Sequence, residues 1–333
     1  MKLEDVANRA KVSSATVSRV LNDAGPVRNT TKARVLKAVQ DLKYHPNIHA
    51  RALAGGKSRT LGMIVSNLEN PFFLDIFRSL ESEARRHGYE VVVANTDYSP
   101  RRLVNSVHLM MGRRVAGLAV IVSEMEPTLM QELIESNLPV VFYDVGTPAK
   151  NISNIRVNYQ KGIQKTVEYL YSLGHRHMAF VGHHTSLEPL LDRKVSFVET
   201  MKRYAGAVEF TTVADRDGPT GGEQATRTLL ATGFKPTAII CVNDYMALGV
   251  LKTLRESGLK VPDDVSVTGY DNISLSAYAY PALTTVNIPR EKIGRLSFEA
   301  LVPPHEGGQV LGRGFLIDPE VVIRESTGPP PRN

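Results

Sequence analysis

Short apolar runs alternate with amphipathic stretches along most of the chain. The apolar runs predict buried strands at 61–65, 90–95, 117–122, 139–144, 178–182, 210–213, 238–242 and 266–270. The stretches between them repeat apolar residues every three or four positions, which predicts helices at 72–88, 102–111, 126–136, 159–173, 192–204, 220–232 and 245–256. Because strands and helices alternate and the cycle is run through twice, the pattern predicts an α/β core of two doubly wound, parallel-sheet lobes.

The first 46 residues lack this strand pattern and show three short helical stretches instead. An apolar face predicts a helix over residues 4–10. Ser13 is a suitable N-cap for a second helix over 14–21, and a third helix begins near residue 30 and ends before Pro46. Two short helices joined by a tight turn and braced by a third form an all-α helix-turn-helix head, whose second helix can enter the major groove of DNA.

The surface chemistry of this head favours DNA as its partner. On the outward face of the second helix, Ser14 and Ala15 are small enough for close approach, and Arg19 can bond a base bidentately. Residues 1–59 contain twelve Lys and Arg against four acidic residues, a net charge of +8, whereas the remainder carries −2. A basic head on a nearly neutral body is typical of a polyanion-binding module attached to a domain with another task.

The composition indicates in which cellular compartment the protein works. The chain is 42% hydrophobic and 22% charged, and none of its apolar runs approaches the ~20 residues that a membrane-spanning helix needs. Its start, with Glu4 and Asp5, is acidic where a signal peptide needs apolar residues. Cys241 is the only cysteine, which excludes an intramolecular disulfide. We therefore expect a cytoplasmic protein with no membrane partner.

The head contains a highly specific string of residues. Residues 5–7 read D-V-A and residues 12–22 read V-S-S-A-T-V-S-R-V-L-N. This string resembles the DNA-binding head of the lactose-repressor (LacI/GalR) family of transcriptional regulators. The resemblance implies base contacts from Ser14, Ala15 and Arg19, and phosphate or sugar contacts on the DNA from Ser13, Thr16, Asn22, Thr30 and Tyr44.

Two residues of the head depart from the family pattern. Lys11 stands in the turn where glycine is usual, and a left-handed conformation there costs a lysine about 1 kcal/mol. Lys2 stands where a threonine cap is common, so the first helix is expected to fray at its start. Neither change removes a group that is expected to contact a base.

The segment after the head is a candidate hinge. Residues 47–54 are helix-capable but are followed by Gly55-Gly56, and eight residues are too few for a stable isolated helix. We expect this segment to fold only when another surface supports it. The resemblance implies that two such hinge helices pair in the minor groove, where Leu53 would wedge a base step open.

Polar side chains gather where the core strands are predicted to end. They include 67–70, 95–97, 243–244 and 271–272, and Arg193 opens a helix after another strand. Ligands of such lobes bind outside the carboxyl ends of the strands. Carboxylates, amides and an arginine beside Phe72 and Phe73 suit the hydroxyls and the apolar face of a sugar ring, whereas we assign Asp244 as a helix cap.

The core shares further motifs with the same family, which read N-P-F-F at 70–73, D-R-K-V-S-F at 192–197 and V-T-G-Y-D-N at 267–272. The resemblance implies lobes of the periplasmic-binding-protein type and effector contacts from Phe72, Phe73, Arg193, Asn243 and Asp271. Purine-responsive members have an aromatic residue where Asp217 stands, so we expect a small carbohydrate effector instead. The expected domains are the head at 1–46, a hinge and linker at 47–58, and a core at 59–333, with a first lobe of about 59–158 and 289–318 and a second of about 159–288 and 319–333.

Three alternatives compete with a ligand-controlled repressor. An enzyme lacks support, because no nucleophile elbow, dinucleotide-binding glycine motif or metal-type cysteine spacing is present, so we expect no cofactor and no metal. A sugar-binding protein of the transport type would explain the core but has no function for the basic head. A regulator controlled by a phosphoprotein corepressor stays open, because residues 90–111 are partly similar to those of catabolite-control relatives. A repressor reading a palindromic operator must be a homodimer, and the tail at 328–333 offers no heptad leucines for a higher oligomer.

Overall fold

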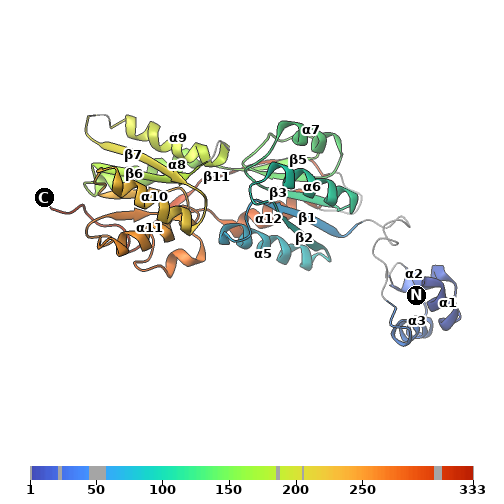
Figure 1. Cartoon of the computed structure of the whole chain (residues 1–333). Coiled ribbons are helices and arrows are strands. Elements are labelled where there is room, and N and C mark those ends of the chain that lie inside the picture. The colour runs from blue at the N-terminus through green and yellow to red at the C-terminus, as the bar shows by residue number, and fades with distance from the viewer. Residues whose placement is uncertain are drawn as a thin grey trace. The chain divides into compact units, whose positions relative to one another are not determined.

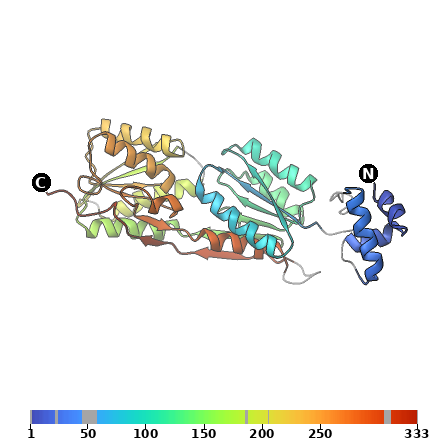
Figure 2. The same cartoon turned by 90° about the horizontal axis from the view of Figure 1, so that it is seen from below.

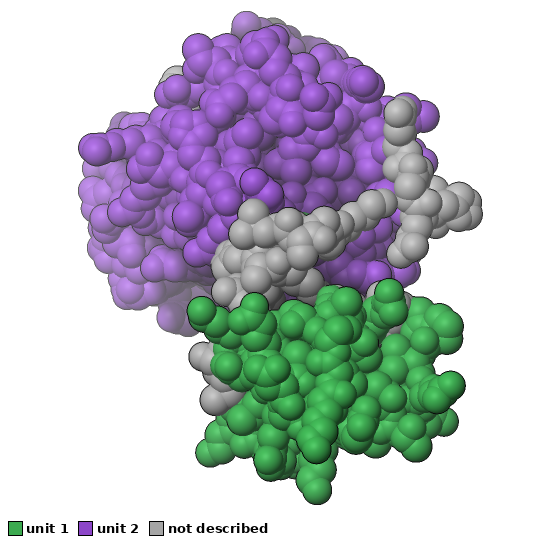
Figure 3. Space-filling view, turned by 90° about the vertical axis from the view of Figure 1, so that its right-hand side faces the viewer, with its two compact units in different colours: residues 1–58 green, residues 59–333 purple. Residues whose placement is uncertain are grey.

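The computed structural model describes residues 2–21, 25–44, 58–184, 188–204, 206–303 and 310–332. The chain divides into two compact units, Met1–Ser58 and Arg59–Asn333 (Figure 3). Most of the expected hinge, including Leu53, lies outside the described residues, as does Asn22.

The first unit is a three-helix head. Its helices are α1 (Leu3–Ala10), α2 (Ser14–Leu21) and α3 (Asn29–Asp41). Their buried faces meet in a small core of Val6, Ala7, Ala10, Val17, Val20, Val35 and Ala38. Lys11 ends α1 in the left-handed conformation, with φ 51° and ψ 52°. At the other end of α1, the Asp5 carboxylate accepts a hydrogen bond from the Lys2 backbone N–H at 2.7 Å, whereas the Lys2 side chain makes no cap hydrogen bond to the helix.

The first lobe of the core is a parallel six-stranded sheet in the order β11-β5-β4-β3-β1-β2 (Figure 1). Its strands are β1 (Thr60–Val65), β2 (Glu90–Asn95), β3 (Gly117–Ile121), β4 (Val140–Tyr143), β5 (Ile152–Val157) and β11 (Gly314–Ile317). Its helices are α5 (Pro71–Arg86), α6 (Pro100–Gly112), α7 (Pro127–Glu135) and α12 (Arg290–Leu301). Along β1, Met63 packs in the cluster that contains α5 and α12, whereas Ile64 packs in the cluster that contains α6 and α7. Helices therefore cover both faces of the sheet.

The second lobe repeats this design with a parallel sheet in the order β7-β6-β8-β9. Its strands are β6 (His177–His183), β7 (Glu209–Asp215), β8 (Ala238–Cys241) and β9 (Ser266–Thr268). Its helices are α8 (Tyr159–Ser172), α9 (Glu188–Lys202), α10 (Pro219–Ala231) and α11 (Asp244–Glu256). Helices α8 and α9 lie on one face of the sheet and α10 and α11 on the other (Figure 1). The two doubly wound lobes predicted from the sequence are thus confirmed.

The chain passes between the lobes three times. It crosses from β5 into α8, returns from β10 (Thr285–Asn287) into α12, and crosses again from β11 to β12 (Glu320–Val322). Strands β10 and β12 pair antiparallel beside the crossings (Figure 2). A short 3₁₀ helix, Ser274–Ala277, follows β9.

Four strands were not predicted, namely β5, β10, β11 and β12. In β5 the cause is two buried polar residues, Ser153 and Asn154, which interrupt the apolar run. Their partners come from outside the strand: the Arg313 N–H donates to Ser153 Oγ at 3.1 Å, and Asn154 donates to the carbonyl of Gly146 at 3.1 Å. The expectation that Arg193 opens its helix was also wrong, because α9 begins five residues earlier, at Glu188.

Candidate functional site

A cleft lies at the carboxyl ends of strands from both lobes, beside the points where the strand order reverses. Its lining consists of Asn70, Phe72, Phe73, Tyr98, Ile121, Val122, Ser123, Tyr143, Tyr159, Arg193, Asn243 and Asp271. All five effector contacts expected from the sequence are among these residues. The cavity is small, with a volume of about 30 Å³.

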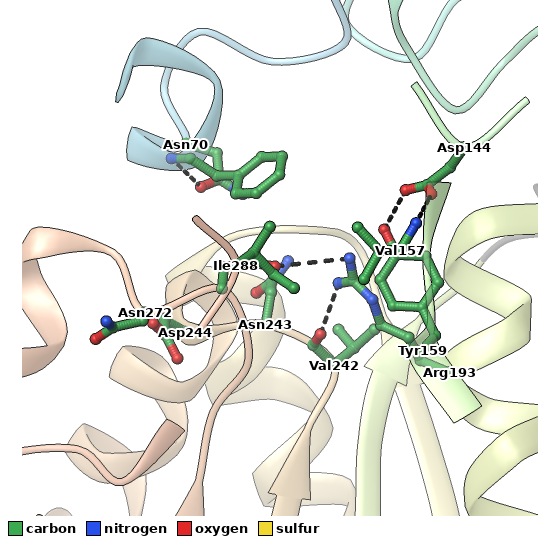
Figure 4. A network of polar contacts seen from close by, with 12 residues as sticks. Asn70, Asp144, Val157, Tyr159, Arg193, Val242, Asn243, Asp244, Asn272 and Ile288 are labelled. Atoms are coloured by element: carbon green, nitrogen blue, oxygen red, sulfur yellow. Dashed lines mark hydrogen bonds and ion pairs between the residues drawn. The ribbon is translucent and has the colours of Figure 1, made fainter. Parts of the chain in front are cut away.

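Arg193 is the buried cation of the cleft, with 5% of its surface exposed. Its Nη1 donates to the Val242 carbonyl at 2.8 Å, and its Nη2 lies 3.6 Å from Asp271 Oδ1 (Figure 4). The guanidinium carbon lies 4.4 Å from the centre of the Tyr159 ring and 4.8 Å from that of Tyr270. Burial lowers the pKa of Arg193, but Tyr159 and Asp271 outweigh it and leave the pKa above its ordinary value. Among the described residues Nε has no hydrogen-bond partner, so it can donate to a ligand.

Asp271 supplies the matching buried carboxylate. It follows β9 with φ 102°, a conformation that costs free energy in any residue but glycine and that marks functional sites. Its backbone is held from two sides, because its N–H donates to the Val286 carbonyl at 2.8 Å and its carbonyl accepts from Arg290. Burial raises the pKa of its carboxyl to about 7, with Arg193 acting in the opposite direction. Within the described residues its Oδ1 accepts no hydrogen bond and can serve a ligand hydroxyl.

Asn243, and not Asp244, caps helix α11. The Asn243 Oδ1 accepts from the Met246 N–H at 2.7 Å, while its Nδ2 donates to Asp217 Oδ1 at 3.0 Å. One of its two amide N–H groups therefore stays available. The cap assignment of Asp244 was wrong because that carboxylate turns inward, where it accepts from Thr285 Oγ1 at 2.5 Å and from the Ile273 N–H at 2.8 Å. Burial, followed by the negative charge of Asp271, raises the pKa of Asp244 to about 8.

Phe72 and Phe73 bring an aromatic wall to the cleft. They stand in the first turn of α5, where Pro71 occupies the first position and Asn70 Oδ1 accepts from the Phe72 N–H at 3.1 Å. Their rings meet edge to face at 5.3 Å, and Phe72 lies 5.8 Å from the ring of Tyr143. The local sequence N-P-F-F thus places both residues in the first turn of α5.

The sequence did not point to the tyrosines of the cleft. Tyr143 and Tyr159 join their hydroxyls at 3.2 Å, and Tyr159 also donates to Asp144. Asp144 accepts a further bond from the Val157 N–H at 2.7 Å, yet its burial still raises its pKa to about 6. Tyr143 ends β4 and Tyr159 begins α8. A tyrosine at the end of a strand or at the start of a helix was therefore the sequence signal that could have identified these residues. Tyr98, three residues beyond β2, was missed in the same way.

In the head, the expected base-contacting residues share one helix. Ala15 and Arg19 are exposed one turn apart on α2, and Ser14 is partly exposed beside them. Ser13 caps this helix as predicted, since its Oγ accepts from the Thr16 N–H at 3.3 Å. The cap satisfies one backbone N–H of the first turn of α2.

The other expected DNA contacts lie on α3 and beyond it. Thr30 is exposed in the first turn of α3, whereas Tyr44 is half-buried and packs against the core of the head. Because Asn22 and Leu53 lie outside the described residues, their assignments stay predictions.

Four histidines, at 175, 177, 183 and 184, lie close together in the sequence, and the first of them has a structural role. His175 lies between Thr237 Oγ1 and the Gly328 carbonyl, each at 2.9 Å, and burial lowers its pKa. In the described parts of the chain, no three His, Cys, Asp or Glu side chains come together as a metal site. In the same residues, no helix combines the length and the apolar character needed to cross a membrane.

Two different family models match the head and the core of this chain. Residues 2–47 match the model of bacterial regulatory proteins, lacI family, and residues 167–327 match that of a periplasmic binding protein-like domain. The HTH-type transcriptional repressors PurR of Photobacterium profundum and Vibrio campbellii are 32% and 33% identical to this chain over 326 residues. Each of these alignments covers 97% of this chain and 98% of the relative.

Solved structures agree over nearly the whole chain. A lac repressor dimer bound to operator and the anti-inducer ONPF is 31% identical with a TM-score of 0.84, and a CelR–cellobiose complex is 26% identical with a TM-score of 0.68. Each alignment covers 98% of this chain and 99% of the other. The chain therefore belongs to the LacI family, as a DNA-binding transcriptional repressor with a ligand-binding core and not an enzyme.

Proposed function

We propose that this repressor binds a palindromic operator as a homodimer in the cytoplasm, and that a sugar or sugar derivative in the cleft controls its operator affinity. The observation that carries the effector assignment is the buried pair of Arg193 and Asp271, which leaves Nε as a donor and Oδ1 as an acceptor without partners among the described residues. A hydroxyl group can accept from the one and donate to the other, because each hydroxyl is both donor and acceptor.

Four further features support a sugar. The remaining N–H of Asn243 adds a second donor, and the ring of Phe72 provides an apolar wall for the face of a pyranose. Asp217, which stands where purine-responsive relatives have an aromatic residue, is a carboxylate bonded to Asn243 and gives a purine ring no surface for stacking. A related solved structure, the CelR complex, holds cellobiose.

The operator assignment is supported by the head. Arg19 is exposed on α2 and is long enough to reach a base edge, while Ala15 and the capped N-terminus allow close approach. A palindromic site requires two heads related by a two-fold axis, and a related lac repressor was solved as a dimer bound to operator. Linkage requires that the ligand change operator affinity by the same factor by which operator changes ligand affinity.

A thermal-shift screen of the full chain tests the effector. The screen should compare cellobiose, monosaccharides, polyols, sugar acids and purine bases. We expect a sugar or sugar acid to raise Tm, and to raise it more as its concentration increases above its Kd. Operator gel shifts with and without that compound then give the sign of control. A purine base as the sole stabilising compound would contradict the proposal.

A matched pair of variants tests the site. Arg193→Met removes the buried cation and should abolish the Tm shift while operator binding persists. Arg176→Met removes a cation of the same lobe, stacked on Tyr171 at 3.8 Å, and should leave both unchanged. Equal sugar response in Arg193→Met and the wild type would refute the assignment of Arg193.

A further inference from the structure

Tyr98 reaches across the cleft from the first lobe. It follows β2 in a tight turn where both Asp97 and Tyr98 have positive φ, 51° and 56°. The Asp97 carboxylate secures this turn, because it accepts from Asn95 Nδ2 at 2.7 Å and pairs with Arg102. Two consecutive left-handed residues cost free energy, so the surrounding contacts must hold the turn in place. The result is that the Tyr98 ring leaves its own lobe and lines the cleft.

The partners of Tyr98 belong to the second lobe. Its hydroxyl donates to Asp217 Oδ2 at 2.7 Å, and its ring centre lies 5.4 Å from that of His183. Burial, followed by the charge of Asp217, raises the pKa of Tyr98, which keeps the proton on the hydroxyl and the hydroxyl a donor. The bond is charge-assisted and part-buried, and charge-assisted bonds are about twice as strong as neutral ones.

Asp217 is itself oriented by the second lobe. Its other oxygen, Oδ1, accepts from Asn243 Nδ2 at 3.0 Å, and Asn243 is fixed as the cap of α11. The two oxygens of one carboxylate thus hold a residue from each lobe. Neither Tyr98 nor Asp217 contacts Arg193 or Asp271 through a hydrogen bond or ion pair among those described, so the arrangement is distinct from the effector-binding pair.

We propose that Asp217 is a positioning residue which, together with Tyr98, forms a clasp that holds the two lobes closed and keeps Asn243 oriented toward the ligand. The inference builds on the proposed function, because the cleft that the clasp closes is the proposed effector site. Loss of one hydrogen bond to a charged group changes an equilibrium by about 10- to 150-fold. Removing the Tyr98 hydroxyl should therefore shift the closed-to-open ratio of the lobes toward the open state by at least about tenfold.

The test measures the distance between lobes in the full chain without any sugar. Spin labels on Glu135→Cys and Lys202→Cys, both exposed and one on each lobe, report that distance by pulsed electron resonance. The native Cys241 is buried and burial raises the pKa of its thiol, so it should remain unlabelled. Labelled chains are diluted with unlabelled ones so that only distances within one chain contribute.

Tyr98→Phe keeps the ring and deletes only the hydroxyl, and Asp217→Ala deletes the acceptor. Both should add a longer distance to the distribution. Tyr169→Phe serves as the control, because its hydroxyl bonds Thr327 within the second lobe at 3.0 Å, and it should leave the distribution unchanged. If neither variant at the clasp lengthens the distance, or if only Asp217→Ala does, the clasp is wrong. A chain whose lobes open in both variants while no sugar raises its Tm would refute the proposed effector and still support the clasp.

Discussion

Substituting Asp271 with Asn tests the electrostatics of the cleft without a ligand. The side chain is 3% exposed, its Oδ1 has no hydrogen-bond partner among the described residues, and the nearest cation, Arg193 Nη2, is 3.6 Å away. Asparagine has the same shape but no charge at any pH. The change therefore removes the cost of ionising this position and leaves its packing nearly intact.

The sign and size of the expected stability change follow from the raised pKa of Asp271. Burial raises the pKa of Asp271 from 3.8 to about 7, so its contribution to the stability of the folded chain is fully present below pH 3.8 and is lost as the pH rises through 7. Between pH 5 and pH 8 this group should lower the free energy of unfolding of the wild type by about 3 kcal/mol, since one pKa unit corresponds to about 1.4 kcal/mol. The Asn variant should lose none of this free energy of unfolding, because asparagine does not ionise. Relative to the wild type, Asp271→Asn should gain about 3 kcal/mol over this range.

Urea unfolding of both chains at pH 5 and pH 8 measures this difference. Asp318→Asn is the matched control, because Asp318 is exposed and its hydrogen bond to Lys161 lowers its pKa. That shift has the opposite sign, so the stability contributed by Asp318 is present above its unfolded pKa and is lost as the pH falls. A stability difference between Asp271→Asn and the wild type that is the same at both pH values would refute the reasoning.

Three further predictions concern the head and the crossing between the lobes. Arg19→Ala should weaken operator binding by about 1–3 kcal/mol and random DNA by less, measured by fluorescence anisotropy; equal losses would make Arg19 a phosphate contact only. Lys11→Gly should stabilise the head by about 1 kcal/mol, because Lys11 has φ 51°, and slow the hydrogen exchange of α1 amides; unchanged or faster exchange would contradict this. Arg290→Met removes the ion pair to Asp75 at 3.0 Å and the donor to the Asp271 carbonyl, so urea unfolding should show a loss of about 2 kcal/mol. If stability is unchanged, Arg290 does not hold the backbone of Asp271.

Features that depend only on residues close together in the sequence could be predicted from the sequence alone. The alternation of apolar runs and amphipathic stretches predicted the order of most strands and helices, because burial on a sheet and on a helix have different periods. The Ser13 cap, the left-handed Lys11 and the turn of α5 that carries Phe72 and Phe73 are also local. The resemblance to the family in turn pointed to Arg193, Asn243 and Asp271, which line the cleft.

Which polar groups meet depends instead on the tertiary fold. Asp244 was expected to cap its own helix, but it bonds Thr285 and Ile273, which lie far along the chain. Strand β5 was missed because its buried polar residues find their partners outside the strand, at Arg313 and Gly146. Tyr98 and Asp217 are 119 positions apart and meet only because both lobes bring their strand ends to one cleft. Their contact depends on a turn with two left-handed residues and on how the lobes close, and neither property is encoded in a local period of hydrophobicity.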